Sequence, residues 1–142
     1  MKKVTKFILI IFVFISFFIS CNPDDTNDTP QPTEDPRDKF TGSWTCNENS
    51  HLNGNSSFTV NITLNPNNSS QIYLANFYQT GTNQKIYGIV TNSSITIPDQ
   101  AVGTFPSLKG SGTITNNNTK INCNYYVNDG SDIDTCTAVF SK

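Results

Sequence analysis

Apolar and polar residues alternate along much of this chain, most regularly between positions 58 and 65. In that segment threonine and asparagine separate the apolar residues Phe58, Val60, Ile62 and Leu64. Successive side chains of a β-strand point to opposite faces, so this period of two is typical of a strand with one buried and one wet face.

The same alternation predicts a series of short strands joined by tight turns. We place them at residues 42–48, 58–65, 71–77, 85–91, 94–97, 112–115, 120–127 and 133–140. The connections are rich in asparagine, glycine and serine, which tolerate left-handed backbone or hydrogen-bond their own main chain. Residues 98–109 contain two prolines and one glycine and are predicted to be a loop, in which residues 101–105 could add a short strand. No segment keeps a helical spacing of apolar residues, so almost no helix is expected.

This pattern predicts an all-β domain built as an eight-stranded antiparallel up-and-down meander barrel. Short connections favour pairing between neighbouring strands, whereas a Greek key needs at least one long return. A closed barrel also leaves no unpaired edge. A β-sandwich is the alternative, because it can be built from the same short strands.

A different pattern occupies residues 1–20. Lys2, Lys3 and Lys6 precede an apolar run over residues 7–19, and Ser20 stands where cleavage would fall. The run is shorter than the about 20 residues that a transmembrane helix needs, but it suits a signal-peptide core of roughly 7 to 15 residues. Residues 1–20 are therefore predicted to be a signal peptide that is removed.

Cys21 follows this segment directly. The stretch Phe18-Ile19-Ser20-Cys21 resembles the lipobox of bacterial lipoproteins, with phenylalanine in place of the usual leucine. The resemblance implies a diacylglyceryl group on the Cys21 sulfur and, after cleavage, acylation of its amine. Two or three acyl chains hold a protein on a bilayer, whereas one gives only marginal binding. The alternative is an ordinary signal peptide whose cysteine enters a disulfide.

Residues 21–38 are predicted to be the lipidated cysteine and a disordered tether. Residues 22–38 carry six acids, one base and four prolines, without a large apolar residue. Such a segment buries too little surface to fold and repels itself. The acids after Cys21 also resemble the tag that sends Bacteroidota lipoproteins to the cell surface, which implies an outer-membrane protein exposed outside. They could instead only solvate the linker, with the protein on the periplasmic face.

Residues 39–142 are expected to form one domain with one core. They carry five bases and five acids, so they have no net charge. Because nucleic acids are bound through clustered lysine and arginine, we exclude a nucleic-acid partner.

The start of this domain carries a short motif. The stretch Lys39-Phe40-Thr41-Gly42-Ser43-Trp44 resembles the opening of lipocalins and their calycin relatives, in particular the small lipocalin-like lipoproteins of Bacteroidota. The resemblance implies a barrel over residues 39–142 in which Trp44 closes one end. The arginine that stacks on this tryptophan in lipocalins is missing from the last predicted strand.

The last hairpin predicts a disulfide. Asn128-Asp129-Gly130-Ser131 is typical of a two-residue turn, and pairing 128 with 131 sets Cys123 opposite Cys136 on a non-hydrogen-bonded rung. A disulfide can close there, and an exported protein meets an oxidising environment. A bond that uses Cys46, or no bond, is the alternative, because the first and last strands adjoin in a closed barrel.

Residues suited to catalysis or metal binding are scarce. His51 is the only histidine, and the domain cysteines lack Cys-x-x-Cys spacing. Asp129, Ser131, Asp132 and Asp134 crowd as in a calcium loop, but the EF-hand spacing is absent and the turn already accounts for Asp129. We expect no enzyme, no metal and no cofactor, with a glycosidase carboxylate pair across the barrel as the alternative.

Two non-catalytic functions suit such a barrel. In the first, the interior holds a small apolar ligand against residues that could equally just fill the core: Trp44, Phe58, Val60, Ile62, Ile72, Leu74, Val90 and Tyr125. In the second, the polar outer faces contact a protein or glycan with the help of exposed aromatics among Tyr73, Phe77, Tyr78, Tyr87 and Tyr126. A measured cavity distinguishes the two.

Overall fold

The computed structural model describes residues 34–142. The predicted signal peptide, the lipidation at Cys21 and the tether up to residue 33 lie outside the described residues. Residues 34–142 form these strands: β1 (Gly42–Ser50), β2 (Gly54–Leu64), β3 (Gln71–Ala75), β4 (Lys85–Thr91), β5 (Ser94–Val102), β6 (Phe105–Thr115), β7 (Lys120–Asn128) and β8 (Ile133–Ser141). Two single 3₁₀ turns, η1 (Asp38–Phe40) and η2 (Phe77–Gln79), are the helical elements of this range.

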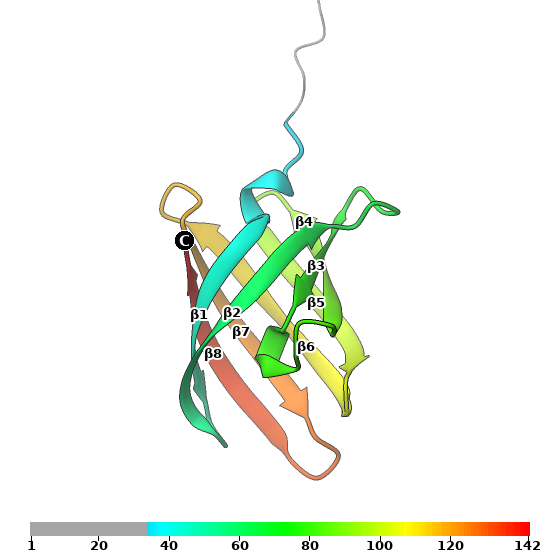
Figure 1. The fold of residues 1–142 in the computed structure, drawn as a ribbon, viewed down its shortest axis with the longest axis vertical. Helices are drawn as coiled ribbons and strands as arrows, with labels where there is room; N and C mark the ends of the chain where they lie inside the picture. The colour runs from blue at the N-terminus through cyan, green and yellow to red at the C-terminus, as the bar shows by residue number, and fades with distance from the viewer. Residues whose placement is uncertain (1–33) are drawn as a thin grey trace, which may run out of the picture. The chain divides into compact units, whose positions relative to one another are not determined.

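The strands close into an antiparallel barrel in chain order (Figure 1). Each strand pairs with the next, and β8 returns to pair with β1, for example Asn47 with Val139. The predicted eight-stranded up-and-down barrel is confirmed, and closure excludes the β-sandwich. Along β1, β7 and β8 every second side chain points inward and is buried, which is the alternation read from the sequence.

The predicted loop at residues 98–109 is wrong, because most of it belongs to β5 and β6. The register between these strands shifts on both sides of Gln100, and these irregularities accommodate Pro98 within a strand. The Gln100 side chain also bonds the neighbouring strand. Its Oε1 accepts from the Tyr87 N–H at 2.9 Å, and its Nε2 donates to the Tyr87 carbonyl at 2.8 Å.

Trp44 closes one end of the barrel. It is fully buried, and its indole N–H donates to the Phe40 carbonyl at 2.7 Å. Lys142, the residue after β8, places its Nζ 4.3 Å from the centroid of the Trp44 ring and donates to the Thr41 carbonyl at 2.7 Å. A cation therefore does cover this tryptophan, although the last strand lacks an arginine.

Residues 34–38, which the sequence analysis assigned to the tether, take part in the barrel domain. The Arg37 guanidinium is buried and donates to the carbonyls of Asn65, Asn68 and Gln71 at 3.2, 2.8 and 3.0 Å. An ion pair with Asp35 at 2.6 Å holds it there and raises the pKa of Arg37. One tether residue thus fixes the β2–β3 turn to the closed end.

The predicted turn between β7 and β8 is also wrong. Asn128 pairs with Ile133, so the loop holds four residues, and Asp129 Oδ1 accepts the N–H groups of Ser131 and Asp132 at 2.8 Å each. This side-chain cap lengthens the loop and moves the register by two residues. Cys123 now faces Ala138, and Cys136 faces Tyr125.

The predicted Cys123–Cys136 disulfide depended on the predicted register and is therefore wrong. Diagonal neighbours on antiparallel strands lie about 7–8 Å apart, beyond the usual reach of a disulfide. Cys46, Cys123 and Cys136, the cysteines of the described range, are all buried free thiols.

Two glycines of β6 let the wall of the barrel come close to β7. A Cβ on Gly110 would lie 2.5 Å from the Asn124 carbonyl oxygen and 2.5 Å from Tyr125 Cβ. A Cβ on Gly112 would come no closer than 3.2 Å, to the Cγ2 atom of Ile121. Of these two glycines, only Gly110 is therefore packed too closely for a larger residue.

We expect Gly110→Ala to lower the free energy of unfolding by about 1–3 kcal/mol, as overpacking of a core does. Gly112→Ala is the matched control, on the same strand and the same face, and should cost less because a side-chain methyl can move. Urea unfolding followed by circular dichroism measures both. Equal losses would contradict the close approach as the reason for Gly110.

Candidate functional site

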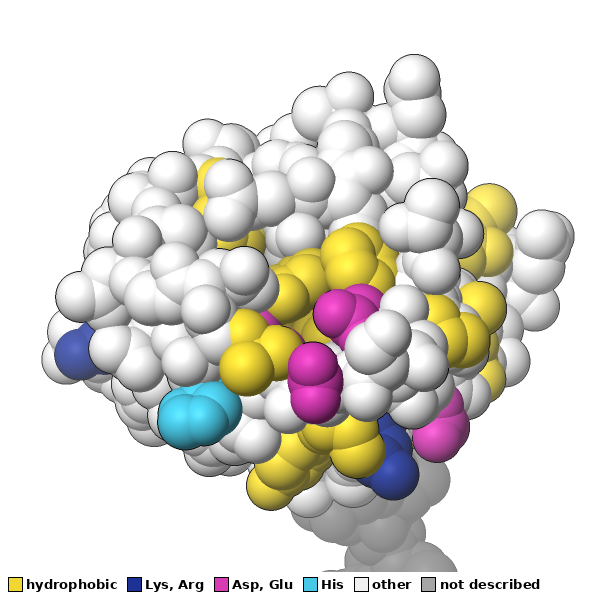
Figure 2. All heavy atoms as spheres, turned by 90° about the horizontal axis from the view of Figure 1, so that it is seen from below, with side chains coloured by type: hydrophobic (Ala, Val, Ile, Leu, Met, Phe, Trp, Pro, Cys, Tyr) yellow, Lys and Arg dark blue, Asp and Glu magenta, His cyan; other side chains and the backbone are white. Residues whose placement is uncertain are grey.

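The end of the barrel opposite Trp44 is hollowed, and we call it the mouth. It is built by the β1–β2, β5–β6 and β7–β8 turns and by η2 (Figure 1). Figure 2 looks into this end and shows hydrophobic and acidic side chains meeting in the hollow.

The mouth holds a cavity of about 410 Å³. Its lining comes from Glu48, Leu52, Asn53, Ser56, Tyr78, Gln79, Phe105, Val127, Asp129 and Asp134. Apolar and aromatic walls with a few convergent polar groups are typical of small-molecule sites.

The segment η2 plugs the barrel beside this cavity. Phe77 is buried, and its ring lies 4.6 Å from that of Tyr125 and 6.1 Å from that of Phe140, centroid to centroid. The sequence analysis placed Phe77 at the end of a strand and among the exposed aromatics, and both assignments are wrong. Asn76, Tyr78 and Gln79 all have positive φ, between 54° and 62°, so the chain turns sharply enough to aim Phe77 inward.

Asp134 is the centre of a hydrogen-bond network at the mouth. Its carboxylate accepts from Ser50 Oγ at 2.5 Å, Tyr78 Oη at 2.8 Å and the Leu52 N–H at 3.0 Å. Asn53 Nδ2 joins Asp134 at 3.2 Å and Tyr78 Oη at 2.8 Å. Burial acts to raise the pKa of Asp134, but these hydrogen bonds outweigh it and lower that pKa to about 2. Asp134 is therefore an anion at neutral pH.

Glu48 is the second buried carboxyl group of the mouth, with 5% of its surface exposed. Tyr125 donates its hydroxyl to Glu48 Oε2, and Ser56 donates to Oε1 at 3.2 Å. Burial raises the pKa of Glu48, the Ser56 hydrogen bond opposes this, and the charge of Asp134 adds to the rise.

The thiols lie on the inner face of the barrel but are not activated. Burial is the first cause that raises the pKa of Cys46, Cys123 and Cys136, with the charge of Glu48 adding to it for Cys46 and Cys136. Protonated, buried thiols are weak nucleophiles. They fill the core in this structure.

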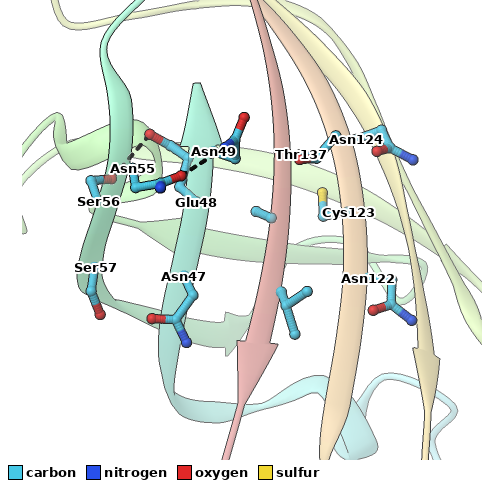
Figure 3. Close-up of a pocket in the computed structure, with 12 residues that line it drawn as sticks. Asn47, Glu48, Asn49, Asn55, Ser56, Ser57, Asn122, Cys123, Asn124 and Thr137 are labelled. Atoms are coloured by element: carbon cyan, nitrogen blue, oxygen red, sulfur yellow. Dashed lines mark hydrogen bonds between the residues drawn. The ribbon is translucent and has the colours of Figure 1, made fainter. Parts of the chain in front are cut away.

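A second hollow lies on the outer wall, across β2, β1, β8 and β7 (Figure 3). It measures about 720 Å³ and is lined mostly by amides and hydroxyls, among them Asn47, Asn49, Asn55, Ser57, Asn122, Asn124 and Thr137. We call it the outer groove. Apart from Glu48, which points inward, its lining carries no acid or base.

The residues predicted to line an apolar ligand all lie in or against the hydrophobic core. Trp44, Val60, Ile62, Ile72, Leu74, Val90 and Tyr125 are buried, and Phe58 packs on them partly exposed. The mouth cavity lies beside this core rather than within it. Whether these residues touch a ligand stays a prediction. Of the candidate surface aromatics, Tyr126 is 46% exposed, and Tyr78 faces the mouth.

The acids of the mouth were missed in the sequence, although a signal was present. Glu48 is in phase with Trp44 and Cys46, and Asp134 is in phase with Cys136, so the alternation places both acids on the buried face. A charged residue on a buried face is a marker of a site. Asp134 was considered in the sequence only as one of four residues crowded as in a calcium loop, although it lies in the strand predicted at residues 133–140.

The described range offers neither a metal centre nor a spanning helix. Within residues 34–142, no three histidine, cysteine, aspartate or glutamate side chains are grouped so as to hold a metal ion. Over the same residues, no helix has the length and apolar character needed to cross a membrane.

Comparison with known proteins gives a fold and no family. No protein-family model matches the chain, and no curated protein matches it. Among solved structures, a redesigned beta barrel, b11L5F_LGL, is similar with a TM-score of 0.51 and 12% identity over 76% of this chain and 95% of that chain. EF1p2_mFAP2b bound to DFHBI is similar with a TM-score of 0.50 and 14% identity over 76% of this chain and 97% of that chain. At such identities the likeness supports the barrel alone.

Proposed function

We propose that this protein is an outer-membrane lipoprotein, anchored through Cys21 and exposed on the cell surface, whose barrel binds one small molecule at its mouth without catalysing a reaction. The lipobox-like stretch before Cys21 and the acids after it support the anchor and its location. The described chain starts at the closed end, where η1 packs beside Trp44, so the mouth is at the other end of the barrel from the point where the tether joins.

The mouth cavity is the observation that carries the binding function. The rest of the interior is filled by a continuous hydrophobic core, so the cavity is where a ligand fits without displacing core side chains. Its lining combines the aromatic side chains Tyr78 and Phe105 with the polar groups of Asn53, Ser56 and Asp134. The similar structure EF1p2_mFAP2b is bound to DFHBI, so the proposal has a precedent in a barrel of this fold.

Filling the cavity tests this function. Ser56, on β2, lines the mouth cavity and also borders the outer groove, whereas its neighbour Ser57 lines the outer groove alone. We expect Ser56→Tyr to abolish retention of a small molecule by the purified lipoprotein, because the added ring occupies the cavity, while Ser57→Tyr retains it. Native mass spectrometry of the detergent-extracted protein measures the bound mass. Retention by Ser56→Tyr, or equal loss in both variants, would remove the mouth as the binding site.

The outer groove supports a second candidate function, the binding of a surface glycan or protein. Its uncharged amides and hydroxyls, on neighbouring strands, match the hydrogen-bonding needs of sugar hydroxyls. Tyr126 is exposed on β7 outside the groove lining. The same pair of variants separates the candidates. Loss of glycan binding in Ser57→Tyr alone would place the function on the outer wall.

A further inference from the structure

The charges of the mouth cavity all have one sign. Its lining includes Glu48, Asp129 and Asp134 and contains no lysine, arginine or histidine. The ion pairs within residues 34–142 are Arg37 with Asp35 and Lys109 with Asp99, and neither involves the mouth. Residues 39–142 carry no net charge, so this local excess is not a consequence of their composition.

Two of these acids are buried without a cation. Asp134 and Glu48 are 2% and 5% exposed, and hydroxyl, amide and backbone donors satisfy their oxygens. Hydrogen bonds from neutral donors leave the negative charge of Asp134 uncompensated, and a buried charge without a partner is costly. A cation in the cavity would offset this cost, whereas an anion would increase it. Burial raises the pKa of Glu48, and a cation beside this carboxyl group would favour its ionised form.

Aromatic rings stand beside these acids. Tyr78 lies edge to face with Phe105 at 5.2 Å and with Tyr125 at 6.3 Å, centroid to centroid. Phe105, Tyr78, Leu52 and Val127 give the cavity an apolar wall. Ring faces attract organic cations, and an apolar wall suits the body that carries one.

We propose that the mouth cavity binds an organic cation, an ammonium group carried on a small apolar or aromatic body. The ammonium lies against Glu48 and Asp134, and the body lies against Phe105 and Val127. A bare metal ion does not suit the site, since the described residues group no three metal-binding side chains. This inference rests on the proposed small-molecule function and specifies its ligand class.

A series of probes that differ only in the head group tests the ligand class. We would titrate the detergent-extracted lipoprotein with 2-phenylethylamine, 2-phenylethanol and phenylacetate by calorimetry. The amine should bind at least about tenfold more tightly than the alcohol, and the anion should not bind. Raising the salt concentration should weaken the binding of the amine and leave that of the alcohol unchanged. Equal affinity for amine and alcohol, a preference for the anion, or no binding of the amine at millimolar concentration would overturn the cation.

Charge-neutral variants locate the contact. Glu48→Gln keeps the shape of the side chain. It should lower the affinity for the amine about tenfold without changing the affinity for the alcohol. Asp132→Asn removes the same charge in the β7–β8 loop, outside the cavity lining, and should leave both affinities unchanged. Equal effects of the two variants would mean that only the general field of the protein acts, and the proposed contact would be wrong.

The head-group series and the cavity-filling variant fail independently. If wild type retains a small molecule that Ser56→Tyr loses, but the alcohol binds as well as the amine, the small-molecule function stands and its cationic ligand does not. If Ser56→Tyr retains the small molecule, the mouth is not the binding site. The series needs no variant, so it holds even where Glu48→Gln reduces folding.

Discussion

Replacing Trp44 with alanine should lower the free energy of unfolding by about 3–5 kcal/mol, the range for removing a large aromatic side chain from a core. The indole is fully buried, donates to the Phe40 carbonyl at 2.7 Å and carries Lys142 over its face at 4.3 Å. Its loss leaves a cavity at the closed end and removes the cap that holds η1. A domain of this size has a total stability of about 5–15 kcal/mol, so much of it would be lost.

The measurement is urea unfolding followed by circular dichroism, because Trp44 is the only tryptophan and its fluorescence disappears with it. Tyr126→Ala is the matched control, an aromatic that is 46% exposed, and should change stability by no more than about 0.5 kcal/mol. Trp44→Phe keeps a ring and removes the N–H, so it separates packing from the hydrogen bond. A loss in Trp44→Ala no greater than in Tyr126→Ala would contradict the role of Trp44 as the plug of the barrel.

The alternation in the sequence was sufficient to predict the barrel. The predicted alternation of inward and outward side chains in β1, β7 and β8 matches the observed burial, and short turns join neighbouring strands as expected. The motif around Trp44 correctly marked the closed end. Strands and short turns depend on residues that are close together in the sequence, so the alternation is enough to predict them.

The errors occur where a side chain hydrogen-bonds to the backbone, either of a neighbouring strand or of its own loop. Gln100 bonds the backbone of Tyr87 and so keeps residues around Pro98 in a strand, and Asp129 caps its own loop and shifts the β7–β8 register. Neither contact changes the hydrophobic pattern. The disulfide prediction depended on that register and failed with it.

The site was harder to predict than the fold because it joins distant segments. Ser50 and Asp134 lie 84 positions apart, and Tyr78 and Asp134 lie 56 apart. Parity alone indicates that Glu48 and Asp134 are buried. It does not indicate that η2 brings Tyr78 over them, because these residues meet only in the folded barrel.

The closed end also bears on how the barrel is attached. Arg37 comes from the acidic segment after Cys21, yet it donates to the carbonyls of the β2–β3 turn while Asp35 holds it by an ion pair. Residues 34–38 therefore belong to the described barrel unit, and the rest of the predicted tether lies outside the described residues.

The proposed lipid anchor predicts the second large effect. In cells fed an alkyne-labelled fatty acid, we expect the wild-type protein to take up label and Cys21→Ser to take up none, because the acyl chains require this thiol. Several chains, at about 0.8 kcal/mol per buried methylene, make wild-type release without detergent negligible. Cys123→Ser is the matched control and should stay labelled, since that thiol is buried in the barrel.

Peptide mass spectrometry should find the modification on residue 21, and protease added to intact cells should digest a surface-exposed barrel but spare a periplasmic one. Label that persists in Cys21→Ser, or wild-type protein that washes from membranes in buffer alone, would remove the lipid anchor and with it the surface location.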